Sequence, residues 1–487
     1  MHEFPLSWLL TAFTAYTALL FFISWLTSRK SDSGSYFSGN KKSPWYIVAY
    51  GMVGTSISGV TFISVPGNVL NQNFFYMPLV LGFVVGYMVI AQILLPLYYK
   101  MNLTSIYTYL EKRFGFFTYK TGASVFMVSR ILGAAVRIFV VVLVLHTFLP
   151  AGKVPFWLVA FVFMFLIFLY TFKGGVKTII WTDVLQTTFM LLAVFLTIYS
   201  VADQMNWSFG DMATAVAGTE YSSWFNWEWS QGTNAIKQFI SGIFIVIVMT
   251  GLDQDMMQKN LSCRNLREAQ KNMYCYGFSF VPLNFLFMCL GILLITLAGK
   301  NGIALPPVND DILPMFATQG YLGEGVLVLF TIGIIAAAFS NSDSALTAMT
   351  TSFCVDILRT GKDAEAIALR KRNRVHVLFS VLLVLFICFF RVVNESSVID
   401  TIYVIASYTY GPLLGMFAFG LFTKRNTKDK YVPYIAVTAP VICYLADSMT
   451  LRVLGYKFGY EMLMINGMLT FAGLWLFSSN NNFNKTT

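Results

Sequence analysis

A group of oxygen-bearing side chains lies in the middle of a long apolar stretch that runs from about Leu327 to Phe353. Ser340, Asp343 and Ser344 are spaced so that they share one face of a helix. Two hydroxyls and a carboxylate form the kind of all-oxygen set that hard cations prefer. An ionised Asp inside a membrane is costly unless a partner compensates it, so the spacing predicts a cation site. Small and hydroxyl residues that only allow close helix packing are the alternative interpretation.

A second carboxylate, Asp183, follows a Gly174-Gly175 pair and lies about one turn inside another apolar stretch. We interpret it as a second cation ligand or a proton carrier, because an ionisable residue at this depth usually has a function. The alternative is a simple hydrogen bond with the hydroxyl of Ser344 or Thr347.

Glycines and hydroxyls also crowd the middle of the stretch from Gly51 to Gly67, ahead of and around Pro66. This composition predicts a broken helix, in which free backbone carbonyls hold a cation and half-helix N-termini face an anionic group of the substrate. A kinked but continuous helix is the alternative.

Two arginines, Arg130 and Arg137, are seven positions apart in a further apolar stretch and so share a helix face. An arginine at this depth either pairs with an acid or binds an anion. The sequence leaves both roles open for each residue.

The elements that must position these residues are membrane spans. The 487-residue chain is 57% hydrophobic and only 11% charged, well below the charge of a soluble protein, which indicates a polytopic all-α membrane protein. Apolar runs predict about thirteen spans: 5–27, 44–70, 75–100, 117–149, 154–173, 178–203, 235–258, 273–299, 323–357, 375–394, 398–423, 431–448 and 459–478.

The net charge of +10 indicates topology and not nucleic-acid binding, because the basic residues lie in short loops. Most of them, for example Lys42, Lys112 and Lys259, fall in alternate loops, which predicts an outside N-terminus and a cytoplasmic C-terminus. The sequence lacks a phosphate-binding GxxxxGK[ST] loop, an HExxH motif and a nucleophile elbow, which weighs against a pump or a hydrolase.

The second and seventh spans are five apart, so spans 2–6 and 7–11 are expected to be inverted copies of each other, with substrate bound at the midplane. This predicts an extra N-terminal helix and loop (1–43), a first repeat (44–203), an external loop (204–234), a second repeat (235–425) and two C-terminal helices with a polar tail (426–487).

Four segments resemble the sodium/solute symporter family, which includes sodium/glucose, sodium/proline and sodium/sialic acid cotransporters. They are TSISGVTFISVPG (55–67), GG…WTDVLQ (174–186), QKNL…REAQK (258–271) and AAAFSNSDSALTAM (336–349). The resemblance implies a leucine-transporter-like fold of inverted five-helix repeats and alternating access.

The resemblance also implies site residues. The common sodium site would use carbonyls of Gly54, Ile57 and Ala337 with the side chains of Ser340 and Asn341. The second cation site of some members would use Asp183, Ser340, Asp343 and Ser344. Here Asn341 replaces an expected Ser or Thr, and Asp343 replaces the Ser of many members.

The substrate positions match no familiar branch. Phe280 stands where the sugar branch carries a lysine, and Gly133 stands where the sialic acid branch carries its arginine, with Arg137 one turn further on. Ser58, Thr61 and Arg137 are therefore the candidate substrate contacts.

The sequence predicts a sodium-coupled symporter, not an enzyme, that imports a small polar organic solute such as a sugar, a sugar acid or another carboxylate. Sodium is the coupling ion and no cofactor is expected. A monomeric unit in the plasma membrane, typical of a bacterial inner membrane, is the expected form, without nucleic acid as a partner. Proton coupling and a symporter-like membrane sensor are the alternatives.

Overall fold

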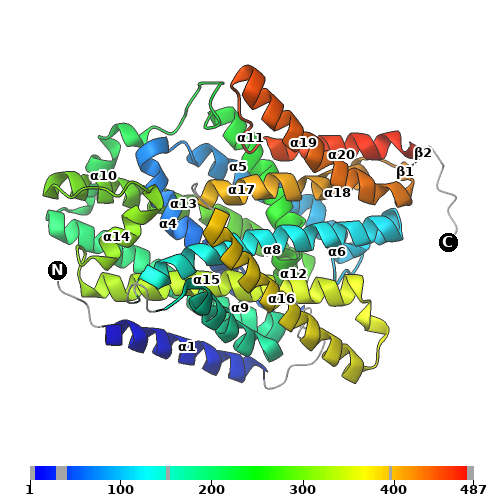
Figure 1. Cartoon of the computed structure of the whole chain (residues 1–487), viewed down its shortest axis with the longest axis horizontal. Coiled ribbons are helices and arrows are strands. Elements are labelled where there is room, and N and C mark those ends of the chain that lie inside the picture. Colours follow the sequence, from blue (N-terminus) through cyan, green and yellow to red (C-terminus); the bar gives the residue numbers. More distant parts are fainter. Residues whose placement is uncertain (1–5, 29–40, 148, 150–153, 394–397, 480–487) are drawn as a thin grey trace.

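The computed structural model describes residues 6–28, 41–147, 149, 154–393 and 398–479, and this part is almost entirely helical (Figure 1). Within these described residues, seven helices are long and apolar enough to cross a membrane, three pairs of bent helices each pass the same test together, and three apolar helices are shorter. Each corresponds to one of the thirteen predicted spans, so the polytopic helical fold is confirmed. Residues 29–40 of the predicted N-terminal segment, and the predicted polar tail beyond 479, lie outside the described residues.

The first six spans are formed by the N-terminal half of the chain. In order the elements are α1 (Leu6–Ser28), α3 (Trp45–Ser56), α4 (Gly59–Gln72), α5 (Met77–Val89), the π-helical turn η2 (Ile90–Leu94), α6 (Leu95–Lys100), α7 (Thr108–Arg113), α8 (Phe116–Thr147), α9 (Phe156–Met205), α10 (Phe209–Ala217) and η3 (Glu220–Ser222).

The other seven spans follow in the C-terminal half. The elements are α11 (Ala235–Val246), η4 (Ile247–Gly251), α12 (Gln254–Asn260), α13 (Leu266–Asn301), η5 (Asn309–Asp311), α14 (Ile312–Thr318), α15 (Glu324–Ser352), η6 (Phe353–Ile357), η7 (Thr360–Lys362), α16 (Glu365–Val393), α17 (Val398–Thr409), α18 (Gly411–Phe422), β1 (Asn426–Thr427), η8 (Asp429–Tyr431), α19 (Val432–Leu454), α20 (Met462–Leu476) and β2 (Ser478–Ser479). Strands β1 and β2 pair antiparallel, with Asn426 opposite Ser479.

Two breaks have the positions that an inverted repeat requires. Helices α3 and α4 of the second span meet at 57°, and the segments Ala235–Gly251 and Gln254–Asn260 of the seventh span meet at 70°. Polar caps stabilise the new helix starts, since Ser58 accepts a hydrogen bond from the Thr61 N–H and Asp253 accepts one from the Asp255 N–H. The predicted break of the second span is therefore confirmed, and the kinked continuous helix is excluded.

The fifth and sixth spans form one helical run, α9, that is interrupted at Gly175. This residue has φ +57° and ψ −157°, a conformation that glycine adopts without the steric penalty of a side chain. The adjacent glycines of the Gly174-Gly175 pair thus separate the helical segment before them from the segment that carries Asp183.

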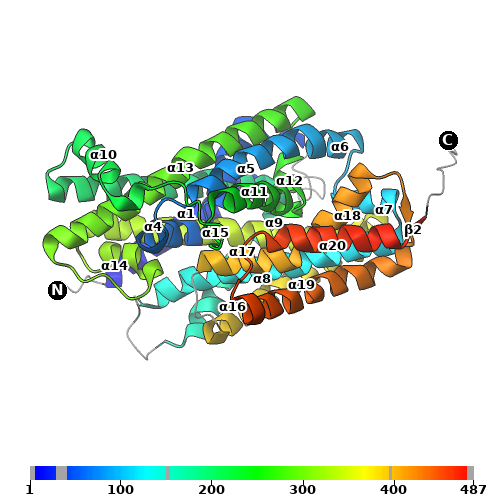
Figure 2. The ribbon, with the colours of Figure 1, turned by 90° about the horizontal axis from the view of Figure 1, so that it is seen from above.

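Helix α15 lies at the centre of the bundle (Figures 1 and 2). In its most apolar window 78% of the residues are buried inside the protein, against 22% for the span that ends at Leu454. Helix α15 packs against α9, while α19 and α20 pack against each other at the periphery. The polar stretch around Ser340 and Asp343 is thereby held inside the protein and away from lipid.

Candidate ion and solute site

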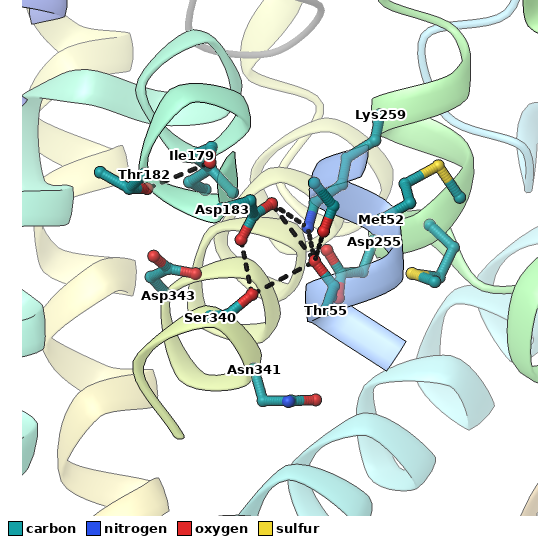
Figure 3. A network of polar contacts seen from close by, with 12 residues as sticks. Met52, Thr55, Ile179, Thr182, Asp183, Asp255, Lys259, Ser340, Asn341 and Asp343 are labelled. Carbon is teal, nitrogen blue, oxygen red and sulfur yellow. Dashed lines mark hydrogen bonds and ion pairs between the residues drawn. The ribbon is translucent and has the colours of Figure 1, made fainter. Parts of the chain in front are cut away.

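Three spans bring a carboxylate and two hydroxyls together at the centre of the protein (Figure 3). Asp183 of α9 accepts a hydrogen bond from Ser340 of α15 at 2.6 Å and one from Thr55 of α3 at 3.2 Å. The Thr55 and Ser340 hydroxyls are themselves 3.3 Å apart. The predicted neighbours Asp183 and Ser340 therefore do meet, and the hydroxyl of α15 that bonds to Asp183 is that of Ser340 and not that of Ser344 or Thr347.

Lys259 of α12 joins the same cluster, which corrects its interpretation as a cytoplasmic loop residue. Its side chain is only 3% exposed, and its Nζ lies 2.7 Å from Asp183 Oδ2 and 2.6 Å from Thr55 Oγ1. The predicted span ends one residue earlier, at 258, whereas α12 continues to Asn260 after the 70° bend. The bend directs Lys259 into the protein, so Asp183 is paired and not an isolated carboxylate.

The break in the second span removes two helical hydrogen bonds at the predicted sodium-binding carbonyls. In a continuous helix the Ser58 N–H would donate to Gly54, but here it donates to the Ser56 carbonyl at 2.9 Å. The Thr61 N–H, which would donate to Ile57, donates instead to Ser58 Oγ at 3.4 Å. The carbonyls of Gly54 and Ile57 thus lose the partners that a helix would give them, as a cation site in an unwound segment requires.

Gly54 also allows the second and sixth spans to approach closely. A Cβ atom added at Gly54 would lie 1.9 Å from Thr187 Oγ1 and 2.9 Å from Thr187 Cβ. Any larger residue would push α3 away from α9, and with it Thr55 away from Asp183. The glycine is therefore needed for the geometry of the cluster as well as for an accessible carbonyl.

The remaining residues of the predicted common site lie on α15. The Asn341 amide donates to the Ala337 carbonyl at 3.0 Å. Figure 3 shows the Asn341 side chain pointing away from the Asp183 cluster. Asn341 lines a neighbouring cavity instead, beside the breaks of the second and seventh spans. Asn341 thus lies between the ion cluster and the solute space.

Asp343 lies next to Asp183 on the side away from Lys259 (Figure 3). Tyr170 donates to Asp343 Oδ2 at 2.6 Å. Among the described residues, Asp343 Oδ1 and the hydroxyls of Ser344 and Thr347 are buried without a hydrogen-bond partner. Buried polar atoms are rarely left unpaired, so these oxygens are available to a ligand such as a cation.

A cavity lies beside the breaks of the second and seventh spans. Its walls combine hydroxyl groups with aromatic rings and two arginines. The lining residues are Thr55, Ser56, Ser58, Val60, Thr61, Tyr76, Phe83, Tyr87, Arg130, Arg137, Ile245, Val246, Met249, Thr250, Met256, Tyr276, Phe280, Asn341, Ile399, Ile402 and Tyr403. The three candidate substrate residues are all among them.

Arg137 extends toward the position of Gly133. Its Nη1 donates to the Gly133 carbonyl at 3.3 Å, and a Cβ added at Gly133 would lie 3.4 Å from the same nitrogen. Within the described residues Arg137 forms no ion pair with a carboxylate. The guanidinium group therefore keeps donors for a ligand in the cavity.

Arg130 has a different environment, although it is on the same helix. It forms ion pairs with Asp255 and, at 3.7 Å, with Asp253. Tyr410 donates to Asp253 at 2.6 Å. All four side chains are buried, so Arg130 is held by acids at the break of the seventh span and serves the packing of that break.

Sequence reasoning missed Lys259 as a member of the cluster, together with Thr55 and Tyr170. The available signal for Lys259 was indirect: a carboxylate buried as deeply as Asp183 requires a cationic partner, and Lys259 directly follows the last residue of a predicted span. Thr55 and Tyr170 carried no such signal, because hydroxyl residues are common in membrane helices.

The chain is similar in sequence to known sodium-coupled transporters. A sequence model of the Sodium:solute symporter family matches residues 36–429. The sodium/sialic acid symporter NanT of Aliivibrio fischeri is 24% identical over 91% of this chain and 88% of its own length. The sodium/sialic acid symporter SiaT of Proteus mirabilis is 23% identical over 92% of this chain and 90% of its own length.

Solved structures share the fold. A Na+-coupled sialic acid symporter in a substrate-bound outward-open state superposes with a TM-score of 0.80 at 20% identity, over 96% of this chain and 97% of that one. Mhp1, a nucleobase-cation-symport-1 family transporter, superposes with a TM-score of 0.54 at 14% identity, over 91% of this chain and 94% of that one.

Proposed function

Because this chain belongs to the Sodium:solute symporter family and is a sodium-coupled carrier of a small organic solute, we propose that its solute is an organic acid whose carboxylate binds Arg137. The observation that carries the proposal is a cavity-lining guanidinium that forms no ion pair within the described part of the chain. A planar guanidinium offers paired N–H donors that match a carboxylate.

The rest of the cavity favours a hydroxylated solute. Ser58 and Thr61 supply hydroxyls, while Phe83, Tyr87 and Phe280 supply aromatic surface of the kind against which sugar rings pack. A sugar acid combines both features, so sialic acid, which is named for two relatives, is the first solute to test.

The binding test compares solutes on the purified protein in sodium and in potassium. A ligand that binds the native state raises its melting temperature. Sialic acid is expected to raise it in sodium and less so in potassium, and a neutral sugar such as N-acetylmannosamine is expected to have a smaller effect. Stabilisation by the neutral sugar alone would contradict the assignment of an acidic solute.

The proposal places sodium at two positions. The first uses the carbonyls of Gly54, Ile57 and Ala337 with Ser340 and Asn341. The second uses Asp183, Ser340, Asp343 and Ser344. The lost helical partners at Gly54 and Ile57 support the first site, and the unpaired oxygens of Asp343 and Ser344 support the second.

Ser340→Ala should weaken the apparent sodium affinity of uptake roughly tenfold, equivalent to about 1.4 kcal/mol. The change removes a hydroxyl shared by both proposed sites and buries no new polar group. Uptake of sialic acid measured against sodium concentration provides the test. Ser342→Ala is the matched control, because that hydroxyl donates to the Ala338 carbonyl of its own helix at 2.6 Å. An unchanged curve in Ser340→Ala would remove Ser340 from the sites.

Asp343→Ser should retain transport but lower either the charge moved per solute or the apparent sodium affinity, because it replaces a full negative charge by a neutral oxygen. The charge-to-solute ratio is measured from the reversal potential in proteoliposomes. Tyr170→Phe is the control, since it removes the 2.6 Å hydrogen bond and leaves the carboxylate. If the ratio, the sodium affinity and the pH dependence all equal the wild-type values, Asp343 is no ion ligand.

We also propose the arrangement of the chain in the membrane. The repeats occupy 44–203 and 235–425, preceded by the helix and loop of 1–43, separated by the external loop 204–234 and followed by 426–487. The N-terminus is outside and the C-terminus is cytoplasmic, in the plasma membrane, with a monomer as the functional unit. The charge distribution of the loops supports this orientation, with Lys259 removed from the count.

A further inference from the structure

Lys259 contacts Asp183, one of the residues of the proposed second cation site. Its ammonium lies 2.7 Å from Asp183 Oδ2 and 2.6 Å from Thr55 Oγ1, and it is buried. Ser340 occupies the other oxygen, Asp183 Oδ1, at 2.6 Å. Both oxygens of Asp183 therefore have partners, and Lys259 is the charged partner, at Oδ2.

The two partners lie on different kinds of helix. Lys259 is near the end of α12, the second half of a broken span, whereas Asp183 is on an unbroken helical segment. The lysine stem is long and flexible, and its ammonium is a compact point charge, so it can leave Asp183 without moving the backbone. The turn that follows is held by the Ser262 hydroxyl, which donates to the Lys259 carbonyl at 2.6 Å.

Electrostatics makes the ammonium and a sodium ion competitors at Asp183. A buried carboxylate needs a cation nearby, because an unpaired charge in a low-dielectric interior is very unfavourable. Two monovalent cations at contact distance of one carboxylate oxygen repel each other strongly in the same medium. Whichever cation binds Asp183 Oδ2 therefore displaces the other.

We propose that Lys259 is a tethered competitor of sodium: its ammonium neutralises Asp183 in the sodium-free carrier, and sodium bound at the second site displaces it. This inference rests on the proposed function, because it requires sodium to bind beside Asp183. Lys259 then lowers the apparent affinity of that site by keeping part of the population unavailable to sodium. It also keeps Asp183 paired with a cation while the empty carrier reorients.

The experiment measures stabilisation of the purified full-length protein by sodium chloride, with potassium chloride at the same ionic strength as the reference. Sodium alone is the probe, so no solute needs to be known. Lys259→Met removes the ammonium and keeps a stem of similar length. It should lower the melting temperature in potassium, enlarge the rise caused by sodium, and reduce the half-saturating sodium concentration at least threefold.

Two further variants keep the test decisive. Lys259→Gln removes the charge but retains an amide that can donate to Asp183, so it should shift the sodium curve in the same direction as Lys259→Met. It replaces Lys259→Met in the test if that variant does not yield folded protein. Lys371→Met is the matched control. Lys371 forms an ion pair with Asp363 at 2.8 Å, close to the 2.7 Å of the Lys259 pair, but it lies at the surface, where its side chain is 40% exposed. Its sodium curve should equal that of the wild type.

The outcomes separate the inference from the proposed function. If sodium does not stabilise the wild type more than potassium does, the proposed sodium sites fail, whatever the variants do. If the wild type responds to sodium but the folded Lys259 variants need the same or more sodium, Lys259 is a structural partner of Asp183 only, and the competition is refuted.

Discussion

We expect Arg137→Gln to reduce uptake of an acidic solute by about a hundredfold, or roughly 2.7 kcal/mol, while the protein remains folded. The guanidinium lines the cavity and bonds only to the carbonyl of Gly133, at 3.3 Å, among the contacts the structure describes for it. Glutamine retains that hydrogen-bonding capacity but removes the positive charge that a carboxylate requires. No buried acid loses its partner, so folding should tolerate the change.

The measurement is sodium-driven uptake of sialic acid into proteoliposomes, together with the melting temperature. Arg391→Gln is the control, because Arg391 is exposed and lies over the ring of Phe156 at 5.6 Å. It should leave uptake unchanged. If the wild type carries only neutral solutes, or Arg137→Gln transports the acid normally, then Arg137 has a structural role and the assignment of the solute class is wrong.

The spans and one of their breaks were predictable from local composition. Runs of about twenty apolar residues fix the spans, because a helix must be that long to cross the hydrocarbon core. The break near Ser58 was predictable because glycines and hydroxyls, which stabilise non-helical backbone and helix caps, are concentrated there.

A third break was missed, although its signal is present. Helices α17 and α18 meet at 46° across Tyr410. Gly411 and Pro412 follow, and a proline in a span removes a backbone donor and disfavours helical geometry in the residue before it. The sequence does not show the tertiary contact made at this break, in which the Tyr410 hydroxyl donates to Asp253 at 2.6 Å.

The site was predictable for residues that a single helix brings together and not for pairs made across helices. Ser340, Asp343 and Ser344 follow from spacing on α15 alone. The link between Lys259 and Asp183 spans 76 positions, and its geometry depends on a 70° bend that turns α12 inward. No pattern in the sequence fixes the direction of that bend, so Lys259 looked like an ordinary loop charge.

The two arginines of α8 show the same limit. Their shared helix face was visible from a spacing of seven positions, but their roles depend on what the seventh span presents to each. Asp253 and Asp255 lie at the break of that span and reach Arg130. Arg137, two turns away, lines the same cavity but forms no ion pair among the described residues.

Arg130→Gln should therefore destabilise the protein by about 3–5 kcal/mol, the cost of leaving a buried charge without its partner. Arg130 is the cation that forms ion pairs with both Asp253 and Asp255 in the described part of the chain. Without it two carboxylates face each other at the break between η4 and α12. The expected observation is a large fall in melting temperature and in the yield of monodisperse protein, in contrast with the folded Arg137→Gln.

A second substitution distinguishes electrostatics from simple loss of packing. Adding Asp255→Asn to Arg130→Gln removes one uncompensated charge, while Asp253 keeps its hydrogen bonds from Tyr410, at 2.6 Å, and from the backbone N–H of residue 255, at 2.9 Å. The double variant should recover a large part of the lost stability, because the effects of two residues in contact are not additive. If Arg130→Gln is as stable as the wild type, or the double variant is no more stable than the single one, the ion pairs do not stabilise this break.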